Sequence, residues 1–267
     1  MKRIKTGLVA LVAAALALSS AGLKAEGEGL TGSVGLAVSA RPEFEGSDRY
    51  KALVLPMADL RYGPVFLSMT QILGLNSPGL GVNLVSAPGW TAAPAVRYRW
   101  ARKEKDSALL RGLGDIDDGI EAGGVIQWQP GPAGLSLRVF QGLGRLEGLT
   151  AELEANYGAV LAGGLKGSVR LSAMFADSKY NRCYFGITPA QSDRSAALGH
   201  RYSAYDPGAG LKHAALYGAL GYDLTESLEL GFSAEYKRLA GPAADSPLVK
   251  RGSANQFMSS VSLSFNF

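Results

Sequence analysis

Few side chains in this sequence could carry out catalysis or hold a metal ion. It contains two histidines, His200 and His213, and one cysteine, Cys183. Serine hydrolysis needs a serine held beside a base, and His213 could lie near several serines at the start of an alternating segment. The sequence lacks the GxSxG pattern that presents such a serine on a sharp turn. We therefore interpret these three residues as bystanders and expect no catalytic site.

Two short motifs resemble ligand-binding loops but lack the required context. Residues 27–32, GEGLTG, match GxGxxG, which binds dinucleotides only between a strand and a helix. Here an expected cleavage site precedes the motif and a strand follows it. Residues 115–119, DIDDG, resemble the start of a calcium loop, yet the twelfth position is Ile126 instead of glutamate. We expect no cofactor and no metal site, and leave open only a loose divalent-ion contact in this loop.

The first 25 residues have the features of a secretory signal peptide. Three basic residues precede an uncharged apolar run over 8–18, and small residues follow it. The run is shorter than the roughly 20 residues that a membrane-spanning helix needs. We expect cleavage after Ala25, with Ala21 as the alternative. The exported mature chain would then comprise residues 26–267.

The net charge of +4 belongs to this leader and not to the mature chain. Four of the 27 Lys and Arg residues lie within the first 25 positions, so 23 remain against 23 Asp and Glu. A neutral chain gives no reason to expect a nucleic-acid partner. The lone cysteine excludes an intramolecular disulfide.

Most of the mature chain alternates between apolar and polar residues, which is the period of a β-strand. In 165–175, for example, Val169 and Leu171 alternate with Lys166 and Arg170. The other clear segments are 29–41, 149–161, 227–239 and 256–267, and weaker ones lie at 50–62, 64–71, 79–86, 91–101, 119–129, 134–142 and 209–222. About twelve strands result, an even number, as bacterial outer-membrane barrels require.

Short and long connections alternate along the chain. The short ones contain turn-forming residues and lie at 62–64, 87–89, 129–134, 163–164 and 223–227. The longer and more charged ones lie at 41–50, 72–78, 101–118, 143–148, 177–208 and 240–255. Outer-membrane barrels have this rhythm because their periplasmic turns are short and their extracellular loops long. The predicted fold class is therefore all-β, a transmembrane antiparallel up-and-down β-barrel of about twelve strands that follows a cleaved signal peptide.

The aromatic residues fall into two groups that match the two interfaces of a membrane. One group lies beside the short turns and comprises Tyr62, Trp90, Trp128, Tyr222 and Phe267. The other lies toward the long loops and comprises Tyr50, Trp100, Phe175 and Tyr236. We expect both groups to face lipid as aromatic girdles.

The chain ends on an alternating strand, VSLSFNF, over 261–267. Its apolar residues, Val261, Leu263, Phe265 and Phe267, are expected to face lipid. Pairing of this last strand with the first would leave no unpaired sheet edge, which hydrocarbon does not tolerate. A terminal phenylalanine on such a strand also resembles the signal by which outer-membrane barrels are recognised for insertion.

The faces expected to point inward carry charges of both signs. They include Glu152, Glu154, Lys166, Arg170, Glu229, Glu235 and Lys237. Paired with one another, these groups would fill the lumen, whereas in a wide lumen they would line a polar pore. A twelve-strand barrel is intermediate between small filled barrels and open porins. We expect a narrow or closed lumen.

The order of several motifs resembles the MipA/OmpV family of outer-membrane proteins. Residues 41–63, RPEFEGSDRYKALVLPMADLRYG, and 184–187, YFGI, are followed by 222–249, YDLTESLELGFSAEYKRLAGPAADSPLV, and by the final phenylalanine. The likeness covers nearly the whole mature chain, and PxFxGS and DSPLV are its more specific motifs. The family more often has tyrosine where Phe44 stands.

This resemblance implies a non-catalytic scaffold in the outer membrane. A chain that resembles the family's namesake, the MltA-interacting protein, is expected to bring a lytic transglycosylase of murein together with a peptidoglycan synthase. A murein hydrolase and a peptidoglycan synthase are thus expected partners, beside outer-membrane lipids and lipopolysaccharide. No catalytic residue carries over. The positions that match the motifs, and are expected to shape outer loops, are Pro42, Gly46, Ser47, Tyr184, Phe185, Gly186, Ser246 and Pro247.

Two other functions stay open at this point, as do the partner, the ligand of the 177–208 loop and the oligomeric state. One is a narrow channel for small solutes, and the other is an enzyme that modifies outer-leaflet lipids and depends on His213. The scaffold hypothesis has a difficulty of its own, because the periplasmic turns are short. A partner would have to grip these turns and residues 26–29, or approach within the membrane plane.

Overall fold

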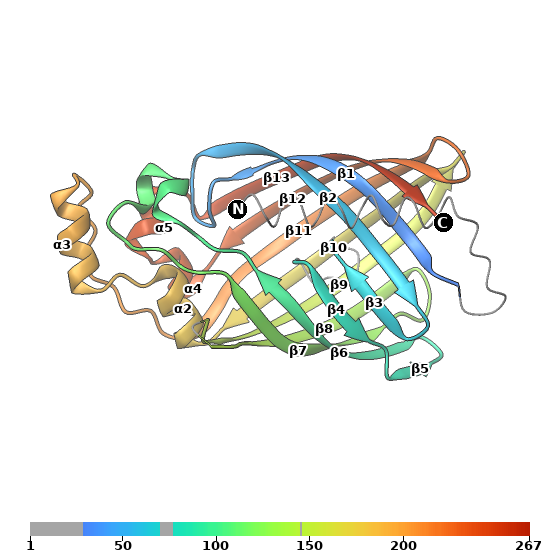
Figure 1. The fold of residues 1–267 in the computed structure, drawn as a ribbon, viewed down its shortest axis with the longest axis horizontal. Coiled ribbons are helices and arrows are strands. Elements are labelled where there is room, and N and C mark those ends of the chain that lie inside the picture. Colours follow the sequence, from blue (N-terminus) through green and yellow to red (C-terminus); the bar gives the residue numbers. More distant parts are fainter. Residues whose placement is uncertain (1–28, 70–76, 145) are drawn as a thin grey trace.

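The computed structural model describes residues 29–69, 77–144 and 146–267. The predicted signal peptide, residues 1–25, lies outside this part. The described chain forms one antiparallel sheet that closes on itself (Figure 1). The strands are β1 Thr31–Pro42, β2 Tyr50–Tyr62, β3 Val65–Ser68, β4 Gly79–Val82, β5 Val85–Ala87, β6 Trp90–Arg99, β7 Gly119–Trp128, β8 Ala133–Gly142, β9 Leu149–Ala162, β10 Leu165–Ala176, β11 Gly210–Asp223, β12 Leu228–Leu239 and β13 Asn255–Asn266.

The barrel has twelve strands because β4 and β5 are two parts of one. Both pair with β6, and the break between them falls at Asn83 and Leu84. The Asn83 amide donates to the Pro64 carbonyl, and the Leu84 amide donates to the Ala92 carbonyl, so hydrogen bonding continues across the break. All twelve predicted segments form strands, and the one clear shortening is that the segment predicted to reach residue 71 ends at Ser68.

The first and last strands close the barrel. β1 pairs with β13 over eight residue pairs, from Ser33 opposite Asn266 to Ala40 opposite Ser259. The chain ends within this pairing, because Phe267 and Gly32 exchange both backbone hydrogen bonds at 2.9 Å. This closure removes the sheet edge that hydrocarbon would leave unsatisfied.

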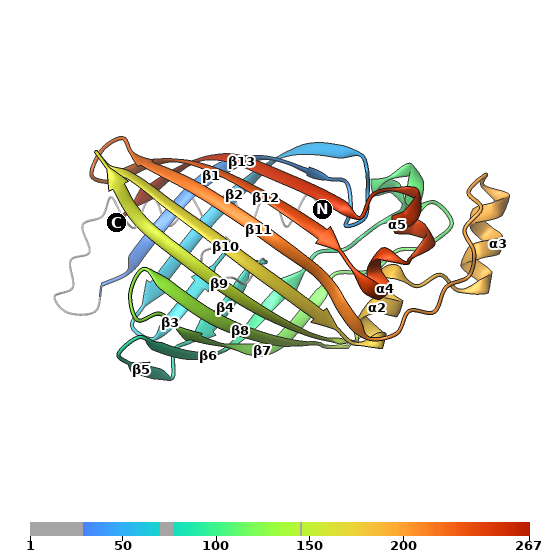
Figure 2. The same cartoon turned by 180° about the vertical axis from the view of Figure 1, so that it is seen from behind.

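Short helices lie in the loops at one end of the barrel, where alternation of residues does not predict them. They are α2 Ser178–Phe185, α3 Pro189–Ala197, α4 Gly241–Ala244 and α5 Pro247–Arg251, with the 3-10 helices η1 Glu104–Asp106 and η2 Ala108–Leu110. All of them gather beyond the strand ends opposite the short turns, with α3 outermost (Figures 1 and 2). Capping residues mark α2 and α3 in the sequence, since Asp177 accepts from the Tyr180 amide and Thr188 forms a capping box with Gln191.

The outward face of the barrel is apolar, and most of it is exposed. An exception is a patch where Val34 and Ala58 are buried and Phe265 and Phe267 pack against them. Leu171, Phe232 and Val261 are each at least half exposed, which a water-soluble domain would avoid on so many strands. The predicted girdle residues Trp90, Trp128, Tyr222, Tyr50 and others are exposed too, as expected for a lipid-facing wall. Among the described residues, no helix has the length and apolarity needed to cross a membrane.

A charge on this wall is expected to destabilise the barrel. Leu171 in β10 is 61% exposed and Leu198 beyond α3 is 58% exposed, so a soluble protein would tolerate arginine at either position. In a bilayer, Leu171→Arg places a charge near the middle of a spanning strand and should lower the free energy of unfolding by about 2–4 kcal/mol. Denaturant titration of the barrel in lipid vesicles measures this, and Leu198→Arg is the matched control. Equal stability of the two variants would contradict the membrane-spanning assignment.

Candidate functional site

The inward-facing side chains become more buried from the turn end of the barrel to the loop end. On β9, Thr150, Glu152 and Glu154 are buried, whereas Val160 and Ala162 near the turn are exposed. Neighbouring strands repeat the gradient, from Lys166 and Ser168 to Met174 and Ala176 on β10, and from Glu229 and Ser233 to Glu235 and Leu239 on β12. Short turns face the periplasm in such barrels. The lumen is therefore filled on the extracellular side and reached by solvent on the periplasmic side.

The filled part begins with a glutamate held by two arginines. Glu121 on β7 is 2% exposed, and its carboxylate accepts from Arg97 Nε at 2.6 Å and pairs with Arg99 as well. The Arg97 guanidinium lies 4.1 Å from the ring centroid of Phe140. One buried carboxylate and its partners thus link the inner faces of three neighbouring strands, β6, β7 and β8.

A second group of charges lies next to it on β8, β9 and β10. Arg138 Nη2 is 2.9 Å from the Glu154 carboxylate and 3.3 Å from that of Glu152. Arg170 lies 4.0 Å from Glu154 and stacks over Tyr217 at 3.8 Å. Both glutamates and Arg138 are buried, so these charges compensate one another and do not line an open passage.

A third group brings an extracellular loop into the lumen. Glu45, in the loop between β1 and β2, lies 2.9 Å from Lys212 Nζ and 3.9 Å from both Lys237 Nζ and His213 Nδ1. Lys212 also donates to the Tyr180 hydroxyl at 3.0 Å. Burial alone would raise the pKa of the Glu45 carboxyl, but the two lysine ammonium groups outweigh it and hold the pKa below its ordinary value.

Helix α2 connects these charges to the loops above them. The rings of Tyr180 and Tyr184 stack at 4.8 Å, and the Arg99 guanidinium lies over both of them, 4.6 Å and 5.1 Å from their centroids. Burial raises the pKa of Tyr184 to about 12, although nearby Arg99 opposes the rise, so its hydroxyl stays protonated at neutral pH. We call this set of buried and partly buried side chains the lumen network: Glu45, Arg97, Arg99, Glu121, Arg138, Glu152, Glu154, Tyr180, Lys212 and Lys237.

The extracellular loops form a packed layer, here called the cap, over the lumen network. It comprises residues 43–49, 100–118, 177–209 and 240–254. One apolar cluster in it joins four of the loop regions through Phe44, Leu110, Leu113, Ile187, Tyr202 and Leu248. A second joins α2, α4 and α5 to the strand ends through Ala176, Tyr180, Phe185, Leu239, Ala243 and Val249. The cap is thus a small core of its own.

Several of the family-motif positions predicted from the sequence meet inside this cap. Ser246 is fully buried, and its hydroxyl donates to the Phe185 carbonyl at 2.7 Å. The Gly46 amide donates to the Gln256 side chain at 3.1 Å, with φ at +105°. A Cβ at Gly46 would lie 2.8 Å from Val249 Cγ2, so a larger residue would be strained and would collide there.

The remaining family-motif positions lie around Gly46 and Ser246. Pro42 ends β1, and Pro247 is the first residue of α5, where its missing amide costs nothing. Ser47 is fully buried and its hydroxyl accepts from the Arg49 amide at 3.0 Å. Gly186 caps α2, and Tyr184 belongs to the aromatic stack on Arg99.

The structure places the residues considered for chemistry in the lumen and in the loops at the extracellular end. His213 is buried in the lumen, where its Nδ1 lies 3.9 Å from the Glu45 carboxylate. Burial raises the pKa of the Cys183 thiol, so the thiol is not activated, although Arg102 and Arg99 oppose the rise. Within the described residues there is no cluster of three potential metal ligands. In the DIDDG loop, Lys103 pairs with Asp117 at 2.6 Å and with Asp115 at 3.5 Å.

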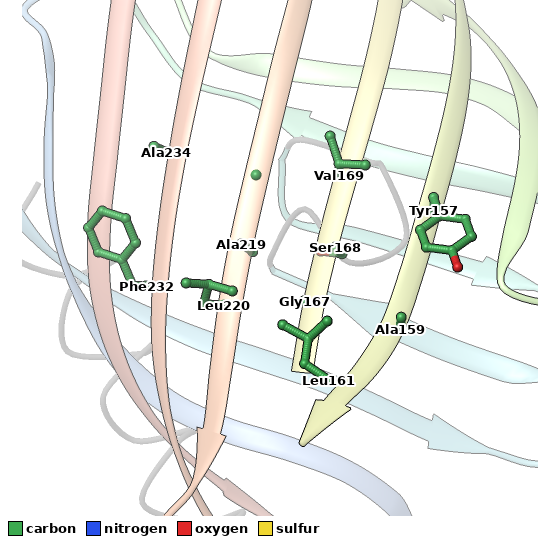
Figure 3. Close-up of a pocket in the computed structure, with 11 residues that line it drawn as sticks. Tyr157, Ala159, Leu161, Gly167, Ser168, Val169, Ala219, Leu220, Phe232 and Ala234 are labelled. Atoms are coloured by element: carbon green, nitrogen blue, oxygen red, sulfur yellow. The ribbon is translucent and has the colours of Figure 1, made fainter. Parts of the chain in front are cut away.

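A hollow of about 420 Å³ lies on the outer wall, over β9 to β12 (Figure 3). Its floor consists of small residues, among them Gly167 and Ala234, and larger side chains such as Leu161 and Phe232 rise around it. The lining is apolar and faces the lipid side. Tyr157 and Ser168 are the polar residues among those that line it.

A match to a family model shows to which protein family the chain belongs. The model described as MltA-interacting protein MipA matches residues 34–267, nearly the whole described chain. The chain belongs to the MipA family. No curated protein matches its sequence. The sequence-based resemblance is therefore confirmed at the level of the family.

Solved structures similar to this MipA-family chain are distant barrels. The NanC porin is 8% identical, with 88% of this chain and 100% of that chain covered and a TM-score of 0.48. The KdgM porin is 8% identical, with 88% and 99% covered and a TM-score of 0.43. OmpT of Vibrio cholerae is 7% identical, with 92% and 99% covered and a TM-score of 0.41.

Seven of the ten members of the lumen network escaped the sequence analysis. Glu152, Glu154 and Lys237 are among the inward charges predicted from alternation. Arg97, Arg99, Glu121, Arg138 and Lys212 are additional members, and all but Lys212 could have been found from the same alternation in the weaker strands. Lys212 adjoins a register shift between β10 and β11, and Glu45 lies in a loop, so alternation assigns neither to the lumen.

Removal of the Glu45 carboxylate should loosen the cap. Glu45→Ala leaves the buried Lys212 without its carboxylate partner, which typically costs about 3–5 kcal/mol. The partly buried Lys237 keeps Glu235 at 3.4 Å. We expect faster protease cleavage within 43–49 and higher ion conductance in planar bilayers than the wild-type barrel gives. Asp48→Ala, an exposed change in the same loop, is the control. An unchanged loop and an unchanged conductance in Glu45→Ala would show that the contact does not hold the cap.

The docking of the 43–49 loop should also depend on acid pH. Because the pKa of Glu45 is lower in the folded state than the ~4.3 of an unfolded glutamate, its contribution is complete above that value and is lost as the pH falls through the folded pKa. Pepsin cleavage of the loop, measured from about pH 5 to about pH 2.5, should be slower in wild type than in Glu45→Gln at the upper end, with the two converging at the lower end. Parallel curves over the whole range would contradict the assignment.

Proposed function

We propose that this MipA-family barrel is a non-catalytic scaffold of the outer membrane that holds a murein hydrolase and a peptidoglycan synthase near the membrane. The observation that carries the proposal is the difference between the two ends of the lumen. The lumen network and the cap fill its extracellular side, while its periplasmic side stays accessible. A barrel built in this way presents its free inner surface only to periplasmic partners. The description of the family as MltA-interacting supports a murein-related partner.

The proposal includes the parts of the chain that direct it to its place. Residues 1–25 act as the signal peptide, and the outward-facing Val261, Leu263, Phe265 and Phe267 act as the recognition signal for insertion. The motif positions, such as Gly46 and Ser246, act by shaping the cap. Outer-membrane lipids contact the apolar wall, and lipopolysaccharide contacts the outer loops.

A narrow channel is the second candidate, favoured by the exposed inward residues near the turns, such as Lys166 and Ser168. For solute to pass, Glu45 and the cap would have to leave the lumen. Steady conductance of the wild-type barrel in a planar bilayer would place this function first.

An enzyme acting on outer-leaflet lipids would require His213, which is buried among charged groups of the lumen and not presented at the lipid-facing wall. His213→Ala is expected to leave lipid composition and turnover unchanged. A loss of any lipid-modifying activity in this variant would overturn the non-catalytic assignment.

In-cell crosslinking tests the scaffold function. A tagged copy of the full chain is crosslinked in growing cells and purified from the envelope, and the attached proteins are identified. We expect a murein hydrolase or a peptidoglycan synthase to be enriched over the amount recovered with a tagged porin from the same cells. Recovery of only neighbouring barrels and lipopolysaccharide would contradict the proposal.

A further inference from the structure

The periplasmic half of the lumen has a hydroxyl-rich wall. Six inward serines on β1, β10, β12 and β13 line this half and are at least partly accessible: Ser33, Ser168, Ser233, Ser260, Ser262 and Ser264. Gly35 and Gly231 lie among them and add no side-chain bulk. Every strand here is paired on both sides, so a ligand would be recognised by these side chains and not by strand addition.

A polar hollow of about 550 Å³ lies at the periplasmic mouth, across the barrel from Ser168. It is lined by the ends of β2, β6 and β7, including Arg61, Thr91, Gln127 and Gln129. Thr91 and Gln127 are opposite each other in the sheet and point inward. The Gln127 amide donates to the Gln129 side chain at 3.3 Å, and Gln129 donates to the Gly131 carbonyl at 2.8 Å, which fixes both amides at the rim.

Arg61 differs from the other accessible cation of this half. Lys166 is balanced by Asp223 at 2.7 Å and Glu229 at 3.2 Å. Arg61 is exposed, and none of the described carboxylates lies within ion-pair distance of it, although Asp59 is two residues away on the same strand and accepts from Ser68. A guanidinium beside a hydroxyl and two amides is suited to a carboxylate, which it can bind with two parallel hydrogen bonds.

We propose that the periplasmic half of the lumen is a receptor for an extended protein segment of the partner, whose carboxylate binds Arg61 while its backbone contacts the serine wall. This inference rests on the scaffold function proposed above and locates its interface. It also removes the difficulty that the periplasmic turns are too short to grip a partner. The interface lies inside the barrel, and the turns only frame its entrance.

The dimensions and the closed end favour a protein segment as occupant. From residue 162 to 154, β9 rises about 26 Å along the strand, or about 20 Å along the barrel axis at a tilt of about 40°. That depth takes roughly six residues of extended chain. The lumen network closes the far end, so whatever enters from the periplasm must stay attached or leave by the same way. A tethered segment of a larger protein suits such a blind site.

Site-specific photocrosslinking in cells tests this interface. A photoreactive amino acid replaces Ser168, which faces the lumen, or Val169, its neighbour on the lipid side with similar exposure. We expect Ser168 to give a discrete adduct with a periplasmic protein, mapped by mass spectrometry to a short segment bearing a carboxylate, and Val169 to give none. Arg61→Glu should lower the adduct yield about ten-fold or more, and Arg61→Lys, which keeps the charge but not the two parallel hydrogen bonds, should give an intermediate yield.

The outcomes separate this inference from the scaffold function. If the partner still co-purifies with the tagged chain but Ser168 gives no adduct, or Arg61→Glu leaves the adduct unchanged, the lumen interface is wrong and the scaffold stands. An adduct that consists of murein stem peptide, recognised by its release with lysozyme, overturns the protein segment in favour of murein itself. Heat-modifiable migration on gels verifies that each variant forms the barrel.

Discussion

The structure depends first on the requirement that every backbone amide and carbonyl within the bilayer be paired. A sheet meets this requirement only if it closes, and here closure uses the full length of the chain. β1 pairs with β13 up to the final residue, where Phe267 exchanges two hydrogen bonds with Gly32. The apolar outward wall follows from the same constraint, because the strands alternate and their other face meets lipid.

Closure creates an interior, and the chain fills only part of it. Charges buried in a lumen must be compensated, since an isolated buried ion is costly. Glu121 is held by two arginines, Arg138 by two glutamates, and Glu45 by two lysines. These groups lie toward the extracellular end, beneath a cap with its own apolar clusters. The periplasmic half is left accessible, so solvent reaches the lumen from its periplasmic end.

This asymmetry links the architecture to the proposed function. An evenly filled barrel would offer a periplasmic protein only its turns, and an evenly open one would conduct. The arrangement in which Glu45 and α2 close one end, while Arg61 and a serine wall remain accessible at the other, favours binding from the periplasm over transport. A carboxylate contact needs one guanidinium and a few neutral polar groups, all of which the periplasmic mouth supplies.

The sequence by itself determined the strands, their number, the two faces and the membrane environment, because a period of two and the rhythm of short and long connections are local properties. It also indicated charges such as Glu152, Glu154 and Lys237 as inward-facing. Only the tertiary structure decided which charges pair, since Glu45 enters the lumen from a loop and Lys212 adjoins a register shift. The packing of Gly46, Phe185 and Ser246 into one cap was equally out of reach, because residues up to 210 positions apart meet there. Such contacts depend on how the loops fold over the barrel, and no local pattern encodes that.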